Sequence, residues 1–115
     1  MEMLIVVAII AVLIAIAIPV FGNQLEKARE AVDAANIRAG YAEVMADAIL
    51  GDTGASVIVD QKQTKADWQT TFDWPHNLAF AGGNPQASST GKWTLTWDAT
   101  IDDNNGGVKA TYSTS

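Results

Sequence analysis

The fold of this chain is decided at its N-terminus, where Glu2 precedes the run MLIVVAIIAVLIAIAIPVF at positions 3–21. Every side chain in that run is apolar, and Pro19 is the only residue in it that disfavours a helix. A helix built from this run has no polar face, so lipid or other apolar helices must surround it. At about 1.5 Å per residue it reaches roughly 28 Å, close to the bilayer core of about 30 Å. The run therefore predicts a single membrane-spanning helix.

Glu2 and Pro19 are the two unusual residues of this stretch. An ionisable side chain at the edge of a membrane segment has either a functional partner or a place among the lipid headgroups, and the sequence leaves both interpretations open. Pro19 removes one backbone donor, and its ring clashes with the carbonyl group of Ala15. We therefore expect the helix to bend near Pro19.

Residues 25–50 predict a second helical half that continues the first. They are rich in Ala, Glu, Lys, Arg and Met, which favour helices. Apolar residues at helical spacing form one stripe against which a globular domain would pack, namely Ile37, Tyr41, Val44, Met45 and Ala48. Together the two halves predict one helix from about Met1 to Leu50, roughly 75 Å long, that ends at the turn Gly51–Gly54.

Charged side chains follow directly after the apolar run. Arg29 lies three residues after Glu26 and four before Asp33. These spacings allow ion pairs on a helix surface. We interpret them as pairs on a solvated face or on a face between subunits.

The C-terminal half predicts a small β domain. Ser56–Asp60 is a short β-branched run, while Lys92–Trp97 and Val108–Tyr112 alternate apolar and polar side chains around a turn at positions 102–107. These two segments predict a β-hairpin, and Asn77–Gly91 between the strands is typical of a loop. The fold class is therefore α+β, a long helix packed against a small antiparallel sheet.

Three aromatic residues, Trp68, Phe72 and Trp74, lie close together in the middle of the chain. This half has few aliphatic residues, so we expect these aromatic side chains to form the core of the domain. The alternative is an exposed platform on which a ligand stacks.

The composition excludes several functions. The chain has 115 residues, no cysteine and a net charge of −6, so it holds one small domain, offers no thiol chemistry and has no basic surface for nucleic acid. His76 is the single histidine, and nothing in the sequence orients it toward a serine. We expect neither an enzyme nor a bound cofactor.

A cluster of oxygen-bearing side chains at Asp102, Asp103 and Asn104 is the one weak candidate for a metal site. Calcium prefers several oxygen ligands, but Gly106 falls where an EF-hand needs a further ligand. We favour a plain turn and predict no metal.

The N-terminal pattern resembles a known family. Glu2 at the head of the apolar run, with Pro19 and Phe21 downstream and a polar helix after them, is similar to the start of type IV pilins and the related pseudopilins of type II secretion. The resemblance implies the pilin fold, with residues 1–22 as the membrane and filament-core half of the helix and residues 23–115 as the amphipathic half and the globular β head. It also implies a short leader that a prepilin peptidase removes before methylating the new N-terminus.

The resemblance further implies the role of major structural subunit of a type IV pilus-like filament. The expected partners are other copies of the chain, an inner-membrane platform protein, an assembly ATPase, the prepilin peptidase and, before assembly, membrane lipid. Glu2 and Pro19 are the expected assembly residues, and the expected location changes from the cytoplasmic membrane to the cell surface. The alternatives are a pseudopilin of a secretion or DNA-uptake system and an anchored binding domain that never polymerises.

Overall fold

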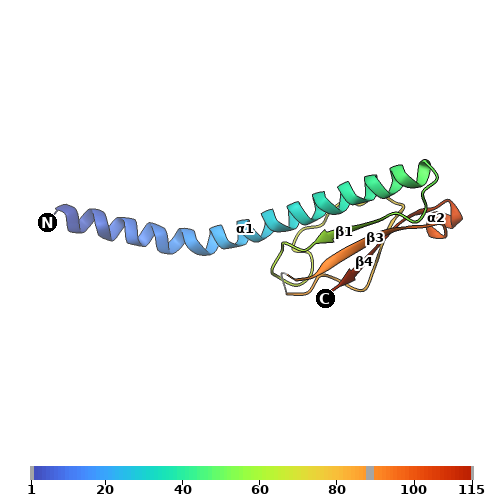
Figure 1. Cartoon of the computed structure of the whole chain (residues 1–115). Coiled ribbons are helices and arrows are strands. Elements are labelled where there is room, and N and C mark those ends of the chain that lie inside the picture. The colour runs from blue at the N-terminus through green and yellow to red at the C-terminus, as the bar shows by residue number, and fades with distance from the viewer. Residues whose placement is uncertain (1, 88–89, 115) are drawn as a thin grey trace.

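The computed structural model describes residues 2–87 and 90–114, and within them the side chains of residues 18–21 and 23 are not described. The chain is elongated, with extents of 74 × 24 × 20 Å. It has one long helix, α1 (Glu2–Ile49), followed by the strands β1 (Ser56–Asp60), β2 (Leu78–Ala81), β3 (Lys92–Asp98) and β4 (Gly107–Ser113). A one-turn helix, α2 (Ile101–Asn104), lies between β3 and β4. The class is α+β, as the sequence predicts (Figure 1).

Helix α1 runs without interruption through both predicted halves, and the halves meet at a shallow angle in Figure 1. The helix continues through Pro19, whose side chain lies outside the described ones. It ends where Gly51 adopts a left-handed φ of 100°, which lets the N–H groups of Gly51 and Asp52 donate to the carbonyl groups of Ala48 and Asp47. The long axis of the molecule agrees with the length predicted for this helix.

The four strands form one sheet in the order β1-β3-β4-β2. The predicted hairpin is present, because β3 pairs antiparallel with β4, with Trp93 opposite Tyr112. Strand β1 pairs antiparallel with the other edge of β3.

The expectation of a wholly antiparallel sheet is wrong at β2. This strand lies parallel to β4, with Leu78 opposite Val108 and Phe80 opposite Ala110. It also falls inside the stretch Asn77–Gly91, for which the sequence predicts a loop. Strand β2 has only four residues, so its side-chain pattern is too short to predict a strand. Its direction follows from the long connection between β1 and β2, which brings β2 to the far edge of the sheet.

The core lies between α1 and one face of the sheet. Ile37 and Val44 of α1 are fully buried against Trp93 and Leu95 of β3, together with Val108 and Ala110 of β4. The predicted helix stripe is therefore confirmed for Ile37, Tyr41, Val44 and Met45, while Ala48 is only half-buried. Gly40 lies within the stripe, and a Cβ atom there would meet Leu95 at 3.1 Å and Val57 at 3.2 Å, so glycine permits this close approach of helix and sheet.

The aromatic residues extend this core beyond the helix. Trp68 stacks on the buried Trp93 with ring centroids 5.6 Å apart, and it meets Phe72 and Trp74 edge-on. Trp74 in turn contacts Phe80 of β2 at 4.9 Å. Trp68 and Trp74 pack against the core but stay partly exposed, so the prediction of a core role is confirmed for these two rings.

Candidate functional site

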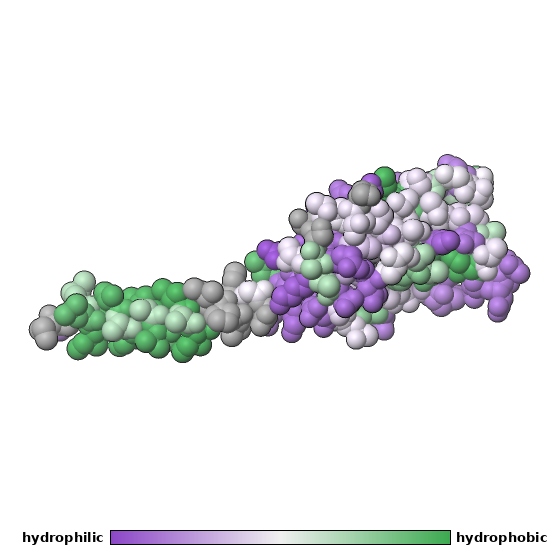
Figure 2. Space-filling model, turned by 90° about the horizontal axis from the view of Figure 1, so that it is seen from below, coloured by the Kyte–Doolittle hydropathy of each residue, from purple (hydrophilic) through white to green (hydrophobic). Residues whose placement is uncertain are grey.

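The N-terminal half of α1 extends away from the sheet and has no cover of its own. All side chains from Glu2 to Ala17 are exposed, among them Met3 at 74%, Leu4 at 68% and Ile16 at 64% of their accessible area. Figure 2 shows this half as a continuous hydrophobic rod beside a largely polar domain. Exposed apolar surface of this extent marks a site of interaction with another molecule or with a membrane.

Among the residues whose side chains are described, no helix is both long enough and apolar enough to cross a membrane.

Glu2 occupies the first turn of α1 and is exposed. Its carboxylate lies near the positive end of the helix dipole, where a negative charge is stabilised. Among the described residues, no hydrogen bond or ion pair of Glu2 is found. The second expected assembly residue, Pro19, has its side chain outside the described ones.

A second feature of α1 is a row of buried carboxylates at the start of its C-terminal half. Glu26, Glu30 and Asp33 are exposed by only 2%, 0% and 0%. The expectation that Glu26 and Asp33 form surface ion pairs with Arg29 is therefore largely wrong. Arg29 does reach Glu26 at 3.3 Å, but Asp33 has other partners.

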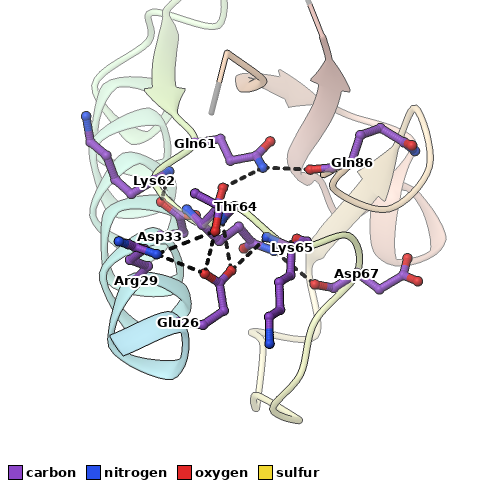
Figure 3. Close-up of polar contacts among 10 residues, drawn as sticks. Glu26, Arg29, Asp33, Gln61, Lys62, Thr64, Lys65, Asp67 and Gln86 are labelled. Atoms are coloured by element: carbon purple, nitrogen blue, oxygen red, sulfur yellow. Dashed lines mark hydrogen bonds and ion pairs between the residues drawn. The ribbon is translucent and has the colours of Figure 1, made fainter. Parts of the chain in front are cut away.

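The partners of these carboxylates are backbone N–H groups of the segment between β1 and β2. Oε1 of Glu26 accepts from Thr64 at 2.8 Å and from Lys65 at 2.9 Å, and its Oε2 accepts from the Thr64 hydroxyl group at 2.8 Å (Figure 3). The two oxygens of Asp33 accept from Lys62 at 2.8 Å and from Gln63 at 2.9 Å.

Glu30 continues the row further along the same segment. Its Oε1 accepts from the N–H groups of Gln69 at 2.5 Å and Thr70 at 3.3 Å. The other oxygen of Glu30 and Oε1 of Gln63 are buried, and neither has a hydrogen-bond partner among the described residues. Three side chains of α1 thus hold the segment from Lys62 to Thr70, which we call the clamped loop, against the helix.

Burial and hydrogen bonding act in opposite directions on these acids. Desolvation raises the pKa of Asp33, and the hydrogen bonds from Gln63 and Lys62 only partly offset it. Desolvation also acts to raise the pKa of Glu26, but the hydrogen bonds from Lys65, Thr64 and Arg29 together outweigh it and hold that pKa below its usual range. Glu26 therefore holds the clamped loop as a carboxylate.

The weak metal candidates lie in the α2 turn. Asp102 and Asp103 adopt left-handed backbone angles, with φ of 57° and 52°, and Asn104 has φ of 68°. Oδ2 of Asp102 lies 3.3 Å from Nε2 of the exposed His76. Among the described residues, no group of three or more His, Asp or Glu side chains is arranged to hold a metal ion. The geometry is that of a tight turn.

The aromatic residues border a shallow cleft. It has a volume of about 250 Å³ and is lined by Trp68, Thr70, Thr71, Phe72 and Trp74. Arg38 of α1 stands beside it, with its guanidinium group 5.8 Å from the Phe72 ring centre and 5.2 Å from that of Trp74, and it donates a 2.9 Å hydrogen bond to the carbonyl group of Asp73. Trp68 places one face against Trp93, while Phe72 and Trp74 meet its ring edge-on and stay partly exposed.

No protein-family model, curated protein or solved structure matches this chain.

Sequence reasoning missed the buried carboxylates, although a signal for them was present. Glu26, Glu30 and Asp33 precede Ile37 and Val44 at helical spacing, so they continue the core stripe toward the N-terminus. Acids in line with a core stripe indicate burial with hydrogen-bond partners, since an unpaired buried charge is strongly unfavourable.

Proposed function

We propose that this chain is the major structural subunit of a type IV pilus-like filament and has the pilin fold as the finer form of its α+β architecture. The observation that carries the proposal is the free-standing apolar half of α1. It projects from a folded head that leaves it uncovered, and it is joined to that head through one continuous helix (Figure 1). A subunit of this shape presents one surface for assembly and a separate domain for the filament exterior.

The energetics of the apolar half favour assembly. Burying one leucine or isoleucine side chain contributes about 1.5–3 kcal/mol, so the exposed side chains from Met3 to Ile16 cannot remain in water. Lipid covers them before assembly, and the same helices of neighbouring copies cover them afterwards. Lipid and a helix bundle are about equally apolar, so the transfer is driven by packing and by polar pairing between helices.

Glu2 supplies the polar pairing in this proposal. Its carboxylate is exposed at the head of the helix and neutralises the N-terminal amine of an adjacent copy within the bundle. A buried carboxylate and a buried amine are each strongly unfavourable alone, so the pair sets the axial register between neighbours. Leader removal, extraction from the membrane and polymerisation then require the prepilin peptidase, the platform protein and the assembly ATPase of the resembling family.

Electron microscopy of fibres sheared from producing cells tests the proposal. Antibody to residues 51–115 should label the fibres along their whole length. Glu2→Ala should abolish fibres or disorder their register while the head stays folded, and Asp73→Ala, which removes an exposed acid of the head, should leave fibres unchanged. Label confined to the cell envelope, or normal fibres from Glu2→Ala, would contradict the proposal.

A second candidate function is a membrane-anchored binding domain that does not polymerise. The cleft beside Trp68 and Phe72 favours it, because half-buried aromatic rings with neighbouring hydroxyl groups are common in ligand sites. Monodisperse monomers in detergent together with an absence of fibres would support this candidate. Short assemblies that never leave the envelope would instead support a pseudopilin.

A further inference from the structure

Helix α1 carries a second apolar stripe, on the face opposite the sheet. Apolar residues alternate at spacings of three and four from Leu25 to Ile49, which is the heptad pattern of helices that pair side by side. We call this stripe the outer seam: Leu25, Ala28, Val32, Ala35, Ala39, Ala42, Ala46 and Ile49. Every position of the pattern is apolar over more than three heptads.

The outer seam is exposed throughout. Leu25, Val32 and Ile49 keep 41%, 48% and 80% of their accessible area, and the alanines between them are exposed as well. The head cannot cover the seam, because the side chains centred on the opposite face, Glu30 and Ile37, are completely buried toward the sheet and the clamped loop. Figure 1 shows the strands on one side of α1 only.

We propose that the outer seam pairs two copies of this chain through their α1 helices, parallel and in register. The charges that flank the seam indicate that the partner is a second copy of the chain in this orientation. In a parallel in-register pair, a residue on one flank faces the residue five positions later on the opposite flank of the partner helix. Arg38 and Glu43 occupy these two flanks and are five positions apart, so each Arg38 meets a Glu43 of the second copy.

Shifting the register of the parallel pair loses this complementarity. A shift by one heptad keeps the seam in contact but places Arg38 opposite Asn36. Arg38 is already held beside the seam by its contacts with Phe72, Trp74 and the carbonyl group of Asp73, so less side-chain freedom is lost when it pairs. The small alanine side chains allow the two helices to approach closely. The two heads lie on outward faces and do not meet.

This pairing differs from the contact proposed for the filament. Two parallel helices in register are related by a two-fold axis, so the contact closes on itself and cannot propagate. It uses residues 25–49, whereas the filament contact uses the apolar half. The outer seam thus makes a discrete pair of subunits, independent of whether the chain forms fibres.

Cysteine crosslinking in membranes of producing cells tests the pairing, and the absence of native cysteine makes single-cysteine variants unambiguous. Ala39→Cys places two thiols face to face on the two-fold axis, where Cα atoms of paired helices come within the range of about 4.4–6.8 Å that a disulfide needs. We expect mild oxidation to convert most of this variant to a dimer. The matched control is Ala99→Cys, another exposed alanine, which lies between β3 and α2 and should remain monomeric.

Further substitutions test whether crosslinking depends on the outer seam or only on the crowding of chains by their apolar halves. Val32→Asp in the Ala39→Cys background should reduce the dimer yield severalfold, because it places two carboxylates opposite each other. Glu43→Arg should also reduce it, and adding Arg38→Glu should restore it, since the exchanged charges again face each other. Rescue by the double exchange is not expected if Arg38 only stabilises its own head.

The results also distinguish this pairing from the filament proposal. Equal dimer yields for Ala39→Cys and Ala99→Cys would overturn the pairing, and normal fibres from the same cells would leave the filament proposal standing. A dimer that forms only when Ala39→Cys and Ala46→Cys chains are mixed would contradict the in-register arrangement. Efficient Ala39→Cys dimers without any fibres would support the pairing and contradict the filament.

Discussion

Gln63 donates its backbone N–H to Oδ2 of Asp33 over 2.9 Å, and this bond joins two residues thirty positions apart. It is one of several bonds of the same kind, in which a carboxylate of α1 accepts from the backbone of the clamped loop. The position of this loop, and of Trp68 that follows Asp67 within it, therefore depends on three acidic side chains of the helix.

Asp33→Ala should lower the free energy of unfolding of the head by about 2–4 kcal/mol. The reason is that the N–H groups of Lys62 and Gln63 lose their acceptors while they remain close to the helix. Urea unfolding followed by tryptophan fluorescence measures the change. The exposed Asp73→Ala should change stability by less than about 0.5 kcal/mol, and an equal effect of the two variants would contradict the role of Asp33.

Glu26 and Asp33 should affect the pH dependence of stability in opposite directions. The pKa of Glu26 is lowered from 4.5 in the folded state, so the stability it contributes is present above pH 4.5 and is lost as the pH falls through the folded value. The pKa of Asp33 is raised from 3.8, so the additional stability that comes from its protonation is present below pH 3.8 and is lost as the pH rises through the folded value, while its hydrogen bonds to the loop remain.

Neutral variants isolate these two contributions. As the pH falls from 6 toward 3, the wild type should lose stability relative to Glu26→Gln. Over the same range, the wild type should gain stability relative to Asp33→Asn. Chemical unfolding at a series of pH values measures both differences. If the stability differences of the two variants from wild type change in the same direction with pH, the opposite pKa shifts of Glu26 and Asp33 are contradicted.

Gly40→Val should destabilise the head by about 1–3 kcal/mol. An added Cβ atom would lie 3.1 Å from Leu95 and 3.2 Å from Val57, so the two further methyl groups of valine require the helix and sheet to separate. Ala31→Val, at an exposed position of the same helix, is the control for valine in a helix; valine has a lower helix propensity than alanine but a higher one than glycine, so propensity alone would make Gly40→Val the less destabilising change. Thermal unfolding of both variants measures the difference, and equal transition temperatures would contradict the close approach.

Trp68→Ala should cost about 3–5 kcal/mol, because Trp68 stacks on the buried Trp93 and contacts Phe72 and Trp74. Phe80→Ala should cost less, since Phe80 keeps 39% of its accessible area and its ring contact is to Trp74. Chemical unfolding followed by circular dichroism compares the two without relying on the removed fluorophore. A smaller decrease in the free energy of unfolding for Trp68→Ala than for Phe80→Ala would contradict the contribution of Trp68 to the core.

The sequence by itself determined the helix, its apolar half, the stripe of Ile37 and Val44 and the hairpin of β3 and β4. Each of these depends on a period of hydrophobicity or on turn residues, which are local properties of the chain. Only the tertiary structure decided the parallel direction of β2 and the partners of Glu26, Glu30 and Asp33. Those carboxylates bind backbone N–H groups, which almost every residue has, so the sequence of the clamped loop contains no sign of its acceptors. The direction of β2 likewise depends on the path of a long connection, and a four-residue strand has too little pattern to indicate it.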